Sequence, residues 1–132
     1  MFFDLLMRHK IHFAQAVAEL GLSAMQARVI LCIDQEAPCT MSAVAQELSC
    51  GPSNLTGLID KLEARALVER RAHPDDRRIR SLAMTRKGAA LRRRLMDRLA
   101  QPAPWMQALS PEDQRQLVVI LRRALELASA DA

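Results

Sequence analysis

The stretch Gly51–Thr85 reads GPSNLTGLIDKLEARALVERRAHPDDRRIRSLAMT, and its hydrophobic period changes partway along. The first part, as far as Arg65, spaces its apolar residues by three and four positions, which predicts an amphipathic helix. After Ala66 the period becomes two, which predicts short strands over 67–71 and 79–84 with a turn at 73–76. A single hairpin is not stable alone, so we expect it to lean on the neighbouring helices.

The helix that begins this stretch has two contrasting faces. One face is small and polar, and the opposite face is a buried stripe of Leu55, Leu58, Ile59 and Leu62. Gly57 costs the helix about 1 kcal/mol relative to Ala, so either it is merely tolerated or something approaches the backbone there, as a DNA groove would. Upstream, Thr40 or Ser42 is expected to cap a short helix over about 43–48, and the break at 49–51 gives helix-turn-helix spacing.

The flanking segments predict further helices, over 2–20, from Ser23, from Thr85 to about Ala100, and from Ser110 onward. Pro102 and Pro104 are expected to break the chain around Trp105. The first and last helices keep apolar faces that the hairpin and its helices do not use, and a two-fold dimer would cover them. We therefore expect a mainly α fold with a small β-hairpin wing. We expect residues 1–132 to form a single domain, with a winged helix-turn-helix lobe over about 22–88 and dimerisation helices over about 1–20 and 89–132.

The chain has 132 residues and a formal net charge of +4, with the basic charge concentrated in one segment. From Arg65 to Arg98 there are twelve Lys or Arg and four Asp or Glu, so the remainder of the chain is net acidic. Such a concentration favours a surface for a polyanion such as nucleic acid. A solvated basic face is the plainer alternative.

Several functional classes find no support in the sequence. No apolar run reaches the roughly 18 residues that a membrane span needs, and the N-terminus does not resemble a signal peptide, so a cytoplasmic protein is expected. The three cysteines lack metal-ligand spacing and are expected to be free thiols. His9 and His12 have no third ligand nearby. No nucleophile motif or Gly-rich phosphate loop appears, so we expect neither an enzyme nor a cofactor or metal site.

The hairpin and the start of the following helix carry a recognisable pattern. NLTGLIDKLEARALVER followed by PDDRRIRSLAMTRKG resembles the MarR family, the multiple-antibiotic-resistance type of bacterial transcriptional regulator. The most specific part is Asp76-x-Arg78, then Leu82-x-Met84-Thr85-x-x-Gly88, and the order of helices extends the resemblance over nearly the whole chain. The chain departs from the family at two positions. Ala66 stands where the family usually has Gly, and Met84 stands where it usually has Leu.

The resemblance implies a roughly triangular homodimer that binds double-stranded DNA, with Pro52–Arg65 in the major groove and the wing at the minor groove. Base readout is expected from Ser53, Asn54, Thr56 and the neighbourhood of Gly57 in this helix, and Lys61 of the same helix is expected to contact a phosphate. In the wing, Asp76 would hold the shape and Arg78 would be the wing-tip arginine, joined by Arg77 and Arg80. Further phosphate contacts are expected from Thr40, Ser42 and Arg65.

Family members commonly bind a small aromatic or phenolic molecule between the dimer helices and the DNA-binding lobe. The corresponding cleft here is predicted to include Met7, Arg8, His12, Met25 and Trp105, although each of these also fits plain packing. Thiol switching at Cys39 or Cys50 is an alternative, but the first-helix cysteine and tyrosines of the hydroperoxide-sensing branch are absent. A winged helix that binds another protein is a further alternative, which an apolar recognition face would have favoured.

Overall fold

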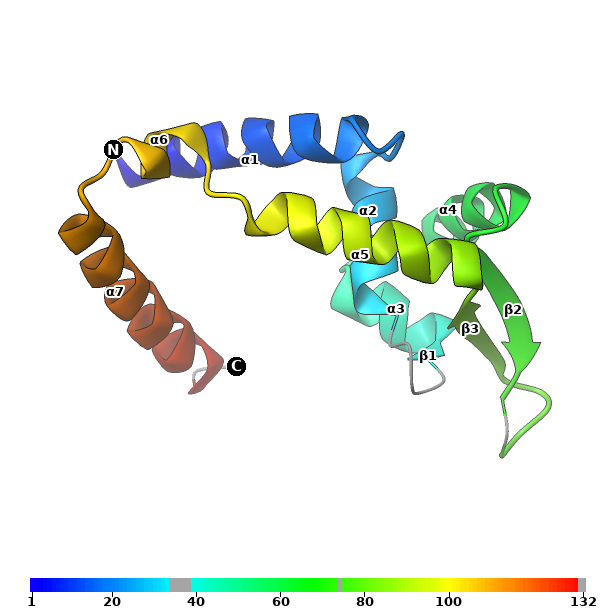
Figure 1. The fold of residues 1–132 in the computed structure, drawn as a ribbon. Helices are drawn as coiled ribbons and strands as arrows, with labels where there is room; N and C mark the ends of the chain where they lie inside the picture. The colour runs from blue at the N-terminus through cyan, green and yellow to red at the C-terminus, as the bar shows by residue number, and fades with distance from the viewer. Residues whose placement is uncertain (34–38, 74, 131–132) are drawn as a thin grey trace. The chain divides into compact units, whose positions relative to one another are not determined.

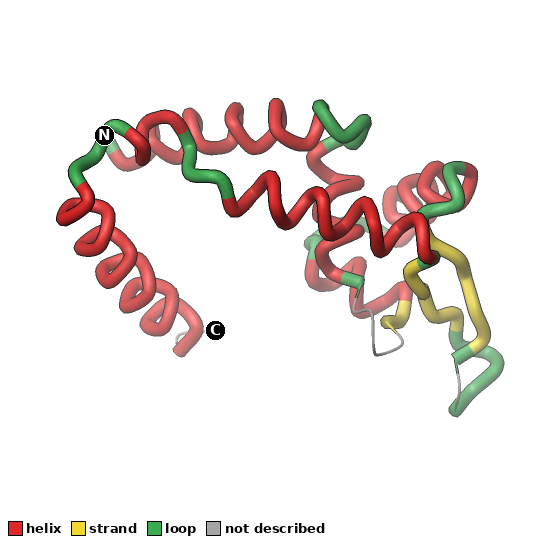
Figure 2. The backbone as a smooth tube through the Cα atoms, viewed as in Figure 1, coloured by secondary structure: helices red, strands yellow, loops and turns green. Residues whose placement is uncertain are grey.

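The computed structural model describes residues 1–33, 39–73 and 75–130 of the chain. The elements are α1 (Phe2–Ala18), α2 (Ala24–Cys32), β1 (Cys39–Thr40), α3 (Met41–Glu47), α4 (Pro52–Ala64), β2 (Val68–Ala72), β3 (Arg80–Met84), α5 (Arg86–Ala100), α6 (Pro104–Gln107) and α7 (Pro111–Ala130). The strands form one antiparallel sheet in the order β1-β3-β2 (Figures 1 and 2). The predicted mainly α fold with a small β wing is therefore confirmed.

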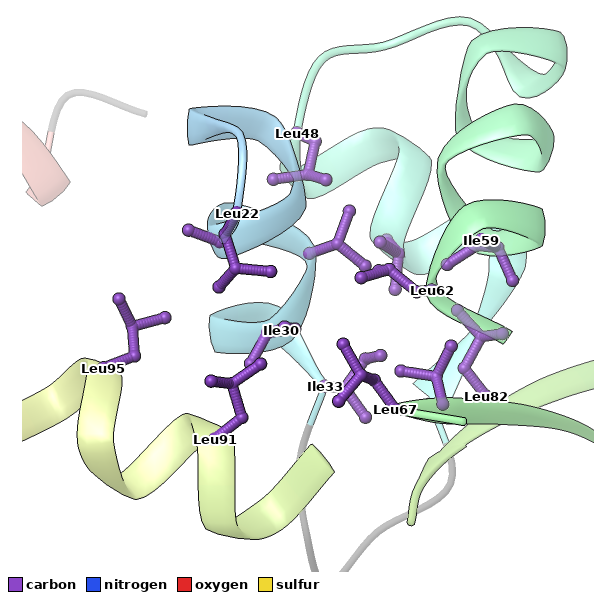
Figure 3. Close-up of a cluster of buried hydrophobic side chains, with 14 of the residues drawn as sticks. Leu22, Ile30, Ile33, Leu48, Ile59, Leu62, Leu67, Leu82, Leu91 and Leu95 are labelled. Atoms are coloured by element: carbon purple, nitrogen blue, oxygen red, sulfur yellow. The ribbon is translucent and has the colours of Figure 1, made fainter. Parts of the chain in front are cut away.

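The described residues form two compact units, Met1–Ala100 and Gln101–Ala132. The first unit contains the helices α1 to α5 and the whole sheet. Its core lies where α2, α4, α5 and the base of the sheet meet, and Figure 3 shows Leu91 and Leu95 of α5 facing this cluster. The side chains that are fully buried there include Val17, Val29, Ile30, Ile33, Val44, Leu55, Ile59, Leu62, Leu67, Leu82 and Leu95.

Helix starts in both units follow the local signals in the sequence. The Ser23 hydroxyl accepts a hydrogen bond from the Gln26 backbone N–H, and the Gln26 side chain accepts one from the Ser23 N–H, which completes the predicted capping box. The Thr85 hydroxyl caps α5 by accepting from Gly88 N at 2.9 Å. The Ser110 hydroxyl accepts from Asp113 N at 3.1 Å ahead of α7. These caps satisfy backbone donors that the first helical turn leaves unpaired.

Several details differ from the sequence-based expectation, and the predicted bounds over 2–20, 43–48 and 79–84 become Phe2–Ala18, Met41–Glu47 and Arg80–Met84. A third strand, β1, pairs with β3 through Cys39 opposite Leu82 and Thr40 opposite Ser81. Strand β2 begins one residue later than predicted, at Val68. Pro74 of the predicted turn lies outside the described residues. The prolines near Trp105 do more than break the chain, because Pro104 occupies the first turn of the short helix α6.

The second unit consists of α6 and α7. Helix α7 is 20 residues long, and none of its side chains over 111–128 is buried. Three apolar side chains, Val118, Leu121 and Leu125, line an open groove of about 690 Å³ on one side of the helix. Because isolated helices are marginal in water, this apolar side marks α7 as an element that packs against something else.

Candidate nucleic-acid interface

A helix-turn-helix is formed by α3 and α4. Four residues separate the helices, and the Cys50 N–H donates to Ala45 O at 3.0 Å across the turn. Ser49 has φ +50° within this turn, a left-handed conformation that a tight reversal requires. The Thr40 hydroxyl caps α3 by accepting from Ala43 N, which selects Thr40 over Ser42 as the cap. Pro52 then begins α4.

The buried stripe of α4 determines which of its side chains face outward. Leu55, Ile59 and Leu62 are buried as predicted, and Leu58 is half-buried. All of the residues predicted to read or contact DNA from this helix are exposed: Ser53, Asn54, Thr56, Gly57 and Lys61. The Thr56 hydroxyl donates to Pro52 O at 2.9 Å. Its oxygen is therefore left as an acceptor for any external partner.

The exposed face of α4 carries a shallow hollow at Gly57. A Cβ atom added to Gly57 would meet nothing within 4 Å. No close packing within the described chain therefore demands a glycine here, despite its helical cost of about 1 kcal/mol relative to Ala. The hollow measures about 430 Å³ and is lined by Met25, Cys50, Ser53, Asn54, Gly57, Leu58 and Lys61.

The wing is the β2–β3 hairpin, which projects from the helices of the first unit (Figure 1). At its tip, one Asp76 carboxylate oxygen accepts from Arg78 N at 2.9 Å, and the Asp76 carbonyl accepts from Ile79 N at 3.0 Å. The His73 N–H donates to Ile79 O at 2.9 Å. Asp76 therefore holds the tip through its side chain and its backbone, and its part in DNA binding stays a prediction.

The arginines of this region fall into two groups. Arg77, Arg78 and Arg80 are exposed, and none of their guanidinium groups has a hydrogen-bond or ion-pair partner among the residues that the structure describes. Arg65 and Arg98, by contrast, are engaged within the first unit. The Arg65 guanidinium donates to Gly21 O at 2.6 Å, and Arg98 binds Glu19 at 2.9 Å and lowers the pKa of that carboxyl below its ordinary value. The wing tip is thus a cluster of uncommitted positive charge, whereas Arg65 already has a structural contact.

The corner between α4 and β2 is held in a strained conformation. Ala66 has φ +54°, a left-handed conformation that costs a residue with a side chain about 1–2 kcal/mol. The Thr85 hydroxyl donates to Ala66 O at 2.7 Å, and Lys87 Nζ donates to Arg65 O at 2.9 Å. The corner is therefore built with the left-handed geometry that suits glycine, and the start of α5 holds it in place. Met84 is half-buried against the core, as expected for a replacement of Leu.

The residues predicted to line a ligand cleft lie on different elements. Met7 and Arg8 are exposed on α1, and His12 is half-buried on the same helix. Met25 lines the hollow beside α4, and Trp105 belongs to the second unit. The first unit therefore places Met25 beside residues that are predicted to contact DNA, and the joint cleft stays a prediction.

The three cysteines are half-buried and are not joined by disulfides to one another. Burial, followed by the charge of Glu47, raises the pKa of the Cys32 thiol, so Cys32 is a poor nucleophile at neutral pH. Cys39 lies in β1, and Cys50 lies in the turn before α4. Among the described residues there is no group of three or more His, Cys, Asp or Glu side chains that could hold a metal ion. In the same residues, every helix is too short or too polar to cross a bilayer.

Arg70 is a residue of this region that the sequence reading missed. It lies on β2, and its side chain forms ion pairs with Asp60 and Glu63 of α4. The sequence does contain a hint of this contact. Two acids, Asp60 and Glu63, lie three residues apart on α4, and such a pair is balanced by a cation from outside the helix. In the sequence, Arg70 is one of twelve basic residues from Arg65 to Arg98.

A helix-turn-helix followed by a β-hairpin defines the winged helix-turn-helix class. Residues 22–79 match the model of the MarR family. Over 117 residues the chain is 28% identical to the uncharacterized HTH-type transcriptional regulator YfiV of Bacillus subtilis, covering 86% of this chain and 73% of YfiV.

Solved structures agree with this match. Wild-type MarR from E. coli in its apo form has a TM-score of 0.82 and 22% identity, over 95% of this chain and 96% of that chain. The transcriptional repressor CouR, bound to a 23-mer DNA duplex, has a TM-score of 0.72 and 25% identity, over 96% of this chain and 92% of that chain. Residues 22–79 therefore carry a match to the MarR family, and the chain shares the winged helix-turn-helix fold of these solved regulators.

Proposed function

We propose that this chain is a cytoplasmic, homodimeric repressor that binds a near-palindromic operator and is released from it by a small aromatic or phenolic molecule. The observation that carries the proposal is the combination of polar, exposed side chains on α4 with three wing-tip arginines that have no partner among the described residues. The likeness to CouR, a repressor bound to duplex DNA, supports the same mode of action. A winged helix that binds another protein would need an apolar recognition face. The exposed side chains of α4 are mostly polar instead.

In this mechanism α4 lies in the major groove. Asn54 is suited to pair with adenine through its amide, and Ser53 and Thr56 supply hydroxyl oxygens to base edges. Lys61 and the hydroxyls of Thr40 and Ser42 would contact phosphates, which give affinity without sequence information. Arg65 would reach a phosphate only by sharing or leaving its bond to Gly21 O. It is therefore the weakest member of the phosphate set.

The wing would contribute a second, separate contact. Arg78 is suited to a narrow minor groove, where the negative potential is enhanced. Arg77 and Arg80 would bind the flanking phosphates. Since Asp76 fixes the tip by two hydrogen bonds, the arginines are presented on a shaped loop.

Two copies of the chain are needed for the proposed operator. In the second unit α7 exposes an apolar stripe, and α1 exposes Phe3, Leu6 and Ile11, at 69%, 49% and 56%. Exposed apolar faces favour an interface. A two-fold axis lets the same face of two copies pack against each other. The two α4 helices would then meet half-sites about one helical turn apart, roughly 34 Å.

Removing the wing-tip charge tests this proposal. We expect Arg78→Ala to weaken binding to the operator roughly tenfold to a hundredfold, because a charge-assisted groove contact is lost. The measurement is fluorescence anisotropy at fixed salt, with a duplex that the wild-type protein has selected from a random pool.

Arg93→Ala is the matched control for Arg78→Ala. Arg93 is exposed on α5, so the control removes the same charge away from the wing and should bind nearly as the wild type does. Equal affinities for Arg78→Ala and the wild type, with both proteins folded, would remove the wing from the mechanism.

A thiol switch is the alternative form of regulation, and the position of Cys50 favours it. Cys50 is half-buried and lines the hollow together with Asn54 and Gly57 of the DNA-facing helix. Oxidation there would put a polar group against the recognition surface. In that case peroxide would release operator DNA from the wild type and not from Cys50→Ser. Equal release from both proteins, or from neither, would exclude Cys50 as the sensor.

A further inference from the structure

Arg70 connects the wing to the recognition helix. Its Nη2 atom lies 2.7 Å from Asp60 Oδ1, and its Nη1 atom pairs with Glu63 Oε2. The other Glu63 oxygen accepts from the Arg70 backbone N–H at 2.8 Å, and Nη2 makes a longer contact of 3.5 Å with Thr56 O. Both the side chain and the backbone of one β2 residue are thus attached to α4.

The partners of Arg70 lie close together on α4. The side chains of Asp60 and Glu63 are three positions apart, so they share one face of the helix, and Thr56 contributes only its backbone carbonyl. One planar guanidinium group, which can donate in several fixed directions, therefore contacts three residues of the helix. The side chain of Arg70 is only 24% exposed. The Glu63 side chain is 30% exposed and that of Asp60 is 60% exposed, so the pair with Glu63 is the one that is less screened by solvent than an ordinary surface salt bridge.

These contacts lie beyond the corner that joins the two elements. The corner bonds from Thr85 and Lys87 reach the carbonyls of Ala66 and Arg65, at the base of the hairpin. Arg70 lies further along β2, opposite Leu82 of β3. Each residue of a strand adds about 3.3 Å to the distance from the corner. It therefore braces the hairpin outside its base, where a small change of angle would move the wing tip.

We infer that Arg70 is a positioning residue for DNA recognition, which sets the angle of the wing against α4 so that both contact DNA together. The inference rests on the proposed DNA-contacting roles of α4 and of Arg78. Arg70 itself touches no DNA in this arrangement, because its guanidinium group is turned onto α4. Its effect on binding is exerted through the wing arginines.

A double-mutant cycle on binding tests this role. We expect Arg70→Gln to lower operator affinity by about tenfold. In the Arg70→Gln background, adding Arg78→Ala should lower operator affinity by at most about a third of the factor by which it lowers it in the wild type. The reason is that a misplaced wing already contributes little to binding. A merely stabilising role for Arg70 would leave the effect of Arg78→Ala the same in both backgrounds, and that equality would overturn the inference.

Two further variants separate the competing explanations. Arg70→Lys keeps the charge, but a single ammonium group cannot reach the same set of acceptors, so it should show the same reduced coupling and serves if Arg70→Gln folds poorly. Asp60→Asn with Glu63→Gln in the Arg70→Gln background removes the two acids. Recovery of affinity there would mean that Arg70 only masks negative charge from DNA, and would overturn the inference. If Arg78→Ala has no effect in the wild type, the proposed wing contact fails first, and the positioning role of Arg70 fails with it.

Discussion

Gly88→Ala should destabilise the folded chain by about 3 kcal/mol, at the upper end of the usual cost of overpacking. A Cβ atom at Gly88 would lie 1.9 Å from the carbonyl oxygen of Leu67 and 2.9 Å from the Met84 sulfur. The first contact is with backbone, which cannot rotate away, so the start of α5 would have to move off the α4–β2 corner. That movement would also break the Thr85 hydrogen bonds that hold Ala66 in its left-handed conformation.

Urea denaturation at one fixed protein concentration measures this effect, as a lower midpoint at an unchanged slope. Gly57→Ala is the matched control, because its Cβ atom meets nothing within 4 Å in the middle of another helix. We expect it to raise the free energy of unfolding by up to about 1 kcal/mol. Equal stability of Gly88→Ala and the wild type would mean that α5 does not approach Leu67 as the structure has it.

The Val118→Glu/Leu121→Glu double variant should abolish the dimer and lower operator affinity by more than about a hundredfold. Both side chains are roughly half exposed on the apolar stripe of α7, at 48% and 46%. Carboxylates buried in a two-fold interface would face each other without partners, which costs several kcal/mol. A monomer would then hold one half-site alone and lose the gain in effective concentration that two linked recognition helices provide.

Sedimentation velocity and anisotropy on the selected duplex check the two parts of this expectation. Arg123→Glu is the control, since it places a carboxylate on the same helix outside the groove-lining residues Val118, Leu121 and Leu125. It should remain dimeric and bind DNA. A double variant that stays dimeric would show that α7 is not the interface. A monomer that binds the operator as tightly as the wild type would show that the dimer is not needed.

Features that depend on local chemistry were predictable from the sequence. The capping box at Ser23, the cap at Thr85 and the start of α7 at Ser110 each involve residues within four positions of one another. The turn before α4 follows from the break at 49–51, and the hairpin follows from the change of hydrophobic period after Ala66. The charge of the wing was visible because its arginines are consecutive or nearly so.

Features that depend on distant pairing were missed. Strand β1 has two residues, too few for a period, and it exists only because β3 pairs with it. Arg70 reads as one more basic residue until β2 is placed beside α4. Ala66 was identified as an unusual replacement for glycine, but the bonds from Thr85 and Lys87 that hold it depend on the tertiary structure.

The most direct test of the account is the affinity of the wild-type chain for its selected duplex against a shuffled duplex of the same length and composition. We predict that the selected duplex binds at least about a thousandfold more tightly at physiological salt, within the usual range for specific readers. Affinity for both duplexes should fall as salt rises, because phosphate contacts release counterions. Equal affinity for the two duplexes, or no binding to either, would contradict sequence-specific recognition by α4 and the wing.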